Sequence, residues 1–239
     1  MPDRYAIANW KMNLPPCGLD TYFKQLTSSP ACKIVVAPPF PYLKELRSRA
    51  TLAGQNCAAQ PSGAFTGEVS AAMLRDCGAS YVILGHSERR HIFGETDAMI
   101  AQKLTMAIQA GLTPVFCVGE PQRIRDAGKE ASFVSSQIEA AVVPELASAS
   151  EILIAYEPVW AVGTGRNATG PMVSEMVRHI RDAVGRFWPA KHVGSAPILY
   201  GGSVTPENIG DLNDHGSVDG FLVGGASLDP VKFSMICGA

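Results

Sequence analysis

A carboxylate that could act as a base follows a short apolar run near the middle of this sequence. Glu157 stands directly before Pro158, and the residue before a proline favours an extended backbone, so Glu157 is expected to end a strand. The apolar run 152–155 before it is typical of a buried strand. The small-residue stretch 161–165 that follows is expected to move as a lid. The segment alone is equally compatible with a general base and with a Glu in an ordinary loop.

Two further polar side chains follow apolar runs elsewhere in the chain. Lys11 would attract an anionic substrate and stabilise negative charge in a transition state; the alternative is a solvated surface lysine. His86 precedes a predicted helical turn at 87–90, and a helix N-terminus disfavours a protonated imidazole. We therefore expect His86 to be a neutral donor to a carbonyl, or else a structural histidine. Glu88 is expected to pair with Lys11 or to join proton transfer.

Two pairs of glycines suggest a phosphate site. Gly201-Gly202 and Gly224-Gly225 follow the last two apolar runs, and Ser203 adds a hydroxyl donor. Backbone N–H groups in such turns can hold a phosphate, which barrels often bind after strands seven and eight. The alternative is that the glycines only permit tight turns.

Short apolar runs alternate with helical patterns along the whole chain. The predicted strands are Tyr5–Trp10, Lys33–Ala37, Thr51–Gln55, Tyr81–Leu84, Thr113–Val118, Glu151–Tyr156, Pro197–Tyr200 and Gly220–Val223. The predicted helices are Asp20–Leu26, Pro41–Arg49, Ser70–Asp76, Asp97–Gln109, a split pair within 121–146, Val173–Phe187 and Val231–Ile236. This alternation predicts an α/β fold, a (β/α)8 barrel, as one domain over residues 1–239. A doubly wound open sheet is the rival, disfavoured because no GxGxxG follows the first strand.

Composition narrows the function classes. The 239 residues are 46% hydrophobic and 18% charged, with a net charge of −2, which fits a globular enzyme and not a nucleic-acid-binding surface. The six cysteines have neither zinc nor disulfide-framework spacing. No signal peptide or membrane-spanning run is recognised, so a cytoplasmic location with no membrane partner is expected.

Together, a base, a neutral donor, a cation and a phosphate site describe proton abstraction beside a carbonyl. The substrate would be a small phosphorylated molecule, and the enediolate product would need shielding from water by a lid. No cluster of His, Asp and Glu with metal-ligand spacing is visible, so neither a metal nor a cofactor is expected.

Five motifs, in order along nearly the whole chain, make the sequence resemble triosephosphate isomerases. They are Asn9–Asn13, Gly85–Arg90, Ala155–Gly165, Tyr200–Ser203 and Val223–Leu228. The resemblance implies interconversion of dihydroxyacetone phosphate and D-glyceraldehyde 3-phosphate, a step of glycolysis and gluconeogenesis, without a cofactor.

The resemblance also implies roles for individual residues. Glu157 would be the base, His86 would polarise the carbonyl, and Asn9 and Lys11 would bind substrate. The phosphate would be held by Gly163, Ser203, Gly224 and Gly225. Glu88, Cys117 and Tyr200 would support the site, and Tyr200 and Ser203 would latch the lid near Ala168 and Gly165. The stretch 60–69 resembles the dimer loop of the family, with Thr66 inserted beside Asn9, His86 and Glu88 of the partner subunit in a homodimer.

The chain departs from the family pattern in places that leave the catalytic groups unchanged. Arg166-Asn167 replaces the usual far hinge of the lid, and Gly170-Pro171 shifts the proline one place from the first helical position. Pro15-Pro16 shortens the first helix, and the last helix is expected to be truncated. Two alternatives stay open: a phosphate-binding barrel without catalysis, and another phosphate-binding barrel enzyme such as a metal-dependent sugar-phosphate epimerase.

Overall fold

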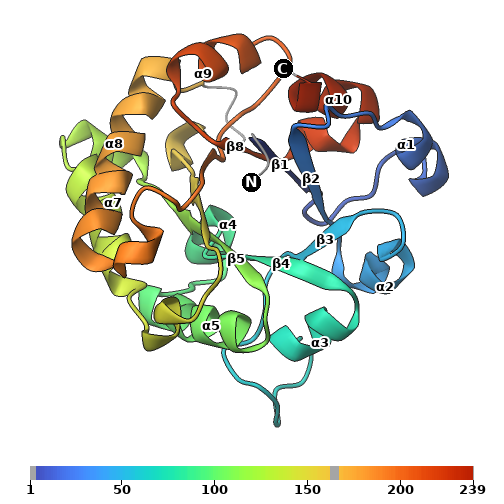
Figure 1. Cartoon of the computed structure of the whole chain (residues 1–239), viewed down its shortest axis with the longest axis horizontal. Coiled ribbons are helices and arrows are strands. Elements are labelled where there is room, and N and C mark those ends of the chain that lie inside the picture. Colours follow the sequence, from blue (N-terminus) through green and yellow to red (C-terminus); the bar gives the residue numbers. More distant parts are fainter. Residues whose placement is uncertain (1–3, 162–166, 239) are drawn as a thin grey trace.

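Parallel strands of this protein close into a ring that helices surround (Figure 1). The structure is a computed structural model that describes residues 4–161 and 167–238. In the described residues the strands pair in sequence order from β1 to β8, and β1 also pairs with β8 to close the barrel. The (β/α)8 barrel predicted from the alternation of elements is therefore confirmed.

The observed strands begin and end within two residues of the predicted ones. They are β1 Arg4–Asn9, β2 Cys32–Ala37, β3 Thr51–Gly54, β4 Ala79–Leu84, β5 Thr113–Val118, β6 Leu153–Tyr156, β7 Ile198–Tyr200 and β8 Gly220–Val223. Apolar side chains fill the ring from inside, among them Ile7, Val35, Ile83 and Leu199. A second cluster packs between the strands and the helices. The barrel is thus a packed core, and its polar site lies at the strand ends.

Helices cover the outside of the ring. They are α1 Leu19–Gln25, α2 Leu43–Leu46, α3 Ala71–Asp76, α4 Ser87–His91, α5 Asp97–Gln109, α6 Gln122–Asp126, α7 Glu130–Ala140, α8 Gly170–Phe187, α9 Ile209–His215 and α10 Pro230–Gly238. Short 3-10 helices occupy Phe40–Tyr42, Pro144–Ala147, Val159–Ala161, Ala190–His192 and Gly225–Leu228. None of the helices within the described ranges is long and apolar enough to cross a membrane.

Three helices differ from the sequence-based expectation. Helix α2 spans only Leu43–Leu46 of the predicted Pro41–Arg49, because a 3-10 helix occupies Phe40–Tyr42 before it. Helix α9 was not predicted, because it is short and buries only Ile209 and Leu212. Helix α8 begins at Gly170, three residues before the predicted start. Its Gly170 N–H donates to Asp211 Oδ2 at 2.7 Å, and a Cβ at this position would lie 2.5 Å from the Asp211 carbonyl oxygen. The close approach of α9 therefore requires glycine here, and Pro171 follows within the first turn.

The connection between β3 and α3 projects beyond the ring, at the bottom of Figure 1. It contains Thr66, which is exposed together with the residues on both sides of it. Such a projecting segment buries little surface on its own chain, so the described subunit does not explain its shape.

Candidate active site

A cavity of about 200 Å³ opens where the strands end. Its lining combines the polar residues from the first and fourth strand ends with the glycine-rich turns after β7 and β8. The lining residues are Asn9, Lys11, His86, Gly201, Gly202, Ser203, Val204, Thr205, Leu222, Gly224, Gly225 and Ala226. The cavity therefore brings the expected cation, the imidazole and the expected phosphate turns to one rim of the barrel.

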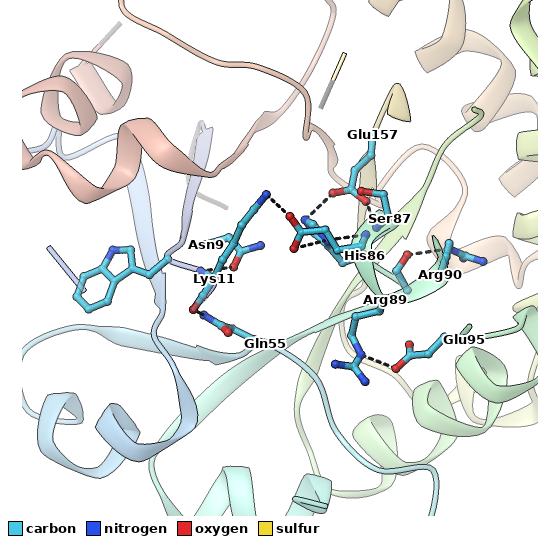
Figure 2. Close-up of polar contacts among 12 residues, drawn as sticks. Asn9, Lys11, Gln55, His86, Ser87, Arg89, Arg90, Glu95 and Glu157 are labelled. Carbon is cyan, nitrogen blue, oxygen red and sulfur yellow. Dashed lines mark hydrogen bonds and ion pairs between the residues drawn. The ribbon is translucent and has the colours of Figure 1, made fainter. Parts of the chain in front are cut away.

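Glu157 follows β6 directly and is 2% exposed. Its backbone N–H donates to the Val118 carbonyl at 2.8 Å, which fixes it against the end of β5. Its carboxylate reaches across to α4, where Oε1 lies 2.9 Å from His86 Nε2 and Oε2 accepts from the Ser87 backbone N–H at 2.8 Å (Figure 2). The carboxylate and the imidazole thus face each other directly.

His86 is the N-cap residue of α4, and its Nδ1 accepts from the Glu88 backbone N–H at 3.2 Å. A nitrogen that accepts carries no proton, so this contact places the ring proton on Nε2. Burial, the largest contribution, lowers the pKa of His86, but contact with Glu157 and the charge of Glu88 raise it more, and the net direction is upward. The neutral state expected from the sequence stays a prediction.

The pH dependence of stability tests whether burial or the neighbouring carboxylates determine the direction of the pKa shift of His86. A folded pKa above the unfolded value of about 6.5 means that the native state binds the extra proton. The stabilisation from this proton is then complete below pH of about 6.5 and is lost as the pH rises through the folded pKa. We expect the free energy of unfolding of the wild type, relative to His86→Gln, to be larger at pH 5.5 than at pH 8 by urea denaturation. A difference that grows with pH would mean that burial prevails.

Lys11 is held in a left-handed backbone conformation with φ of 53°. This conformation costs a non-glycine residue about 1–2 kcal/mol. Neighbouring side chains fix it, because Asn9 Oδ1 accepts from the Lys11 N–H at 3.1 Å and Gln55 Nε2 donates to the Lys11 carbonyl at 2.8 Å. The ammonium lies 2.6 Å from Glu88 Oε1, so the predicted pairing with Glu88 is present. Backbone strain of this kind is typical of residues that a site holds in place.

The expected phosphate residues that the structure describes line the same cavity. Ser203 follows β7, and Gly224 and Gly225 follow β8, where a 3-10 helix begins at Gly225. Gly163 lies outside the described residues, as does Gly165, the expected contact of Ser203 in the lid. Burial raises the pKa of Tyr200 to about 12. The Tyr200 hydroxyl is buried and has no hydrogen-bond partner among the described residues, so its role as a latch toward Ala168 stays a prediction.

Cys117 lies inside the barrel on β5 and is fully buried. Burial and the nearby charge of Glu157 hold the pKa of its thiol well above the usual range. Arg90 connects the ends of β4 and β5, because its Nη2 donates to the Cys117 carbonyl at 3.1 Å and its Nε donates to the Gly85 carbonyl at 2.7 Å. Cys117 is thus a neutral packing residue beneath the site.

Several residues that support Glu157 were not recognised from the sequence. Gln137 of α7 is buried and accepts from the Gly119 N–H at 2.8 Å; a Cβ on Gly119 would lie 1.7 Å from the Glu157 carbonyl oxygen. Glu120 is fully buried and accepts from Trp160 Nε1 at 2.8 Å. The proline after Glu120 repeats the pattern at Glu157 and could have indicated a second strand-end carboxylate. No sequence signal could have indicated the Ser87 backbone amide, since every residue carries one.

Comparison with known proteins decides the family. The family model for triosephosphate isomerase matches residues 4–239. A triosephosphate isomerase of Taenia solium is 44% identical over 237 residues, covering 95% of each chain, and one of Aquifex aeolicus is 41% identical over 242 residues, covering 98% of each. This chain belongs to the triosephosphate isomerase family. The resemblance based on five short motifs is confirmed at full length.

Membership of the triosephosphate isomerase family agrees with the residues found around the cavity. Among the residues that the structure describes, no group of three or more His, Cys, Asp or Glu side chains could hold a metal ion.

Proposed function

We infer that this protein interconverts dihydroxyacetone phosphate and D-glyceraldehyde 3-phosphate by proton transfer through an enediolate. The single observation that supports this most strongly is the direct contact of Glu157 with His86, with 2.9 Å between Oε1 and Nε2, behind a cavity that His86 and Lys11 line. A base, a carbonyl-polarising donor and a cation are the groups that this reaction needs.

Glu157 takes the proton from the carbon beside the substrate carbonyl, and the electron pair of that C–H bond forms the enediolate. His86 gives its Nε2 proton to the carbonyl oxygen as negative charge develops there, and Lys11 stabilises the same charge. The imidazole then takes the proton of the neighbouring hydroxyl, so that this oxygen becomes the new carbonyl and His86 is neutral again. The protonated Glu157 then returns the proton to the neighbouring carbon. This division between a Glu base and a neutral His is the established scheme of the family and is adopted here.

The substrate phosphate binds at the glycine-rich turns that follow β7 and β8 and line the cavity. Ser203, Gly224 and Gly225 supply it with backbone N–H groups, together with Gly163, and Asn9 contacts the substrate beside Lys11. Closure of the lid excludes water so that the enediolate does not eliminate phosphate. Tyr200 acts as a latch toward Ala168, and Glu88 acts through Lys11, which it contacts.

A coupled assay with glyceraldehyde 3-phosphate tests this function. We expect turnover that is unchanged after exhaustive treatment with EDTA, because every proposed role belongs to a side chain or to the backbone. The rival functions give other results: a binding barrel without catalysis gives no turnover, and a metal-dependent epimerase gives turnover that chelation abolishes.

We also propose a homodimer of single-domain subunits spanning residues 1–239. Beside the catalytic cavity lies another of about 230 Å³, lined in part by Lys11, Met12, Gln55 and Phe93. Met12 is 92% exposed and Phe93 65% exposed, which is costly for large apolar side chains in an isolated subunit. A projecting segment with Thr66 near its tip, from a second subunit, fits such a cavity. The free state of all six cysteines supports a cytoplasmic location.

Substitution of Thr66 tests the homodimer. We expect Thr66→Arg to shift the wild-type dimer toward monomer in sedimentation velocity at micromolar concentration, since a large cation cannot enter a cavity that already contains Lys11. Activity should fall with the dimer fraction. Lys44→Met on the exposed side of α2 serves as a control that leaves the dimer intact. A wild-type protein that is monomeric and fully active would contradict the proposal.

A further inference from the structure

The loop between β7 and α9 is bridged by one side chain that does not line the cavity. Asn208 Oδ1 accepts from the Thr205 backbone N–H at 2.8 Å, and Asn208 Nδ2 donates to the Ser203 carbonyl at 2.8 Å. The two bonds span the loop on either side of Val204. Ser203, Val204 and Thr205 all line the catalytic cavity, so Asn208 lies behind its wall.

The chemistry of this bridge allows few other side chains. A backbone N–H can only donate and a carbonyl can only accept, so the oxygen of the amide must face Thr205 and its nitrogen must face Ser203. Aspartate would keep the acceptor but place a negative charge against a carbonyl oxygen, and alanine would lose both bonds. At position 208, directly before α9, only the asparagine side chain can both accept from the Thr205 N–H and donate to the Ser203 carbonyl.

The bridge determines where the amides of the loop are directed. Because a trans peptide is planar, a Ser203 carbonyl held by Asn208 turns the Val204 N–H to the opposite side of the peptide. Within the described residues, neither the Ser203 N–H nor the Val204 N–H has a hydrogen-bond acceptor. Both residues line the cavity, so amides without a partner are available to an anion there.

We propose that Asn208 is a positioning residue for the phosphate: its carboxamide holds residues 203–205 in the conformation whose amides bind the phosphate group of the substrate. This inference rests on the proposed function, which assigns the phosphate to this wall. A preorganised loop binds an anion without losing backbone conformational freedom during binding. Without Asn208, the loop would have to become ordered each time a substrate molecule binds, which costs binding free energy.

The experiment compares Asn208→Ala and Asn208→Asp with Glu207→Gln. Glu207 is the exposed neighbour of Asn208 and makes neither of the two bridging bonds. Three quantities are measured: the inhibition constant of inorganic phosphate, kcat/KM for glyceraldehyde 3-phosphate, and the isomerisation rate of glyceraldehyde, which has no phosphate. Thermal unfolding checks that each variant folds.

We expect Asn208→Ala, which loses both bridging bonds, to weaken phosphate inhibition and to lower kcat/KM for the phosphorylated substrate by about tenfold, the effect of weakening one hydrogen bond between the loop and the phosphate. Asn208→Asp should lose at least as much, because its charge also repels the phosphate. Glyceraldehyde isomerisation should be unchanged, and Glu207→Gln should match the wild type.

A parallel loss on both substrates, or unchanged phosphate inhibition in either Asn208 variant, would overturn the inference. If Asn208→Ala does not fold, Asn208→Asp keeps the bond to Thr205 and carries the same test. Failure of the proposed function is distinguishable, because the wild type would then not isomerise glyceraldehyde 3-phosphate, while the affinity for inorganic phosphate, measured directly by calorimetry, would still report on Asn208.

Discussion

Glu157→Asp is expected to lower kcat by about 10²- to 10³-fold. The substitution keeps the charge but withdraws the carboxylate by about 1.5 Å, the length of one carbon–carbon bond. In the wild type Oε1 lies 2.9 Å from His86 Nε2, so the carboxylate is already within reach of the position where the substrate carbonyl meets the imidazole. A base that falls short by this distance must transfer the proton across a gap or distort β6 to reach it.

Phosphate affinity separates a catalytic defect from a binding defect in this variant. The residues proposed to hold the phosphate follow β7 and β8, so inorganic phosphate should inhibit Glu157→Asp as strongly as it inhibits the wild type. Steady-state kinetics with both triose phosphates, and thermal unfolding, complete the measurement. Glu139→Asp, on the exposed face of α7, is the matched control and should retain full turnover. Near-wild-type turnover in Glu157→Asp would remove Glu157 from its proposed role.

The fold was predictable because the spacing of apolar residues along the chain indicates which residues are buried. Every strand of the barrel is a mainly apolar run, and the candidate site residues follow directly after those runs. The residues at the carboxyl end of the barrel could therefore be predicted from the sequence. Helix α9 was not predicted because it buries only two apolar side chains, too few for a helical pattern. The close approach of α9 to Gly170 of α8 is visible only in the three-dimensional structure.

The polar side chains gathered near the cavity were predictable from the sequence, but the residues that hold them in place were not. Glu157, His86 and Lys11 are unusual residue types at strand ends, which makes them visible. Gln137 looks like any polar residue of a surface helix, yet it is buried and bonds the Gly119 amide. The left-handed backbone of Lys11 likewise has no sequence signal, because it results from contacts with Asn9 and Gln55. Such supports depend on which strand ends meet around the ring.

Lys11→Met is expected to lower kcat/KM by at least about 10³-fold. The substrate is an anion that gains further negative charge in the transition state. Without the ammonium, the nearby charged groups are the carboxylates of Glu157 and Glu88, and Glu88 also loses its partner at 2.6 Å. The same change removes attraction in the ground state and stabilisation in the transition state, so both KM and kcat should worsen.

The backbone strain at Lys11 makes a second variant informative. Lys11→Gly also removes the cation, but glycine adopts a positive φ without cost, so it relieves the strain that Met would keep. We expect both variants to lose activity to the same extent, with Lys11→Gly the more stable of the two in thermal unfolding. Lys44→Met controls for the loss of one positive charge on the surface and should behave as the wild type. If Lys11→Gly kept substantial activity while Lys11→Met did not, the position would act through its backbone, and the cation would have no role in the reaction.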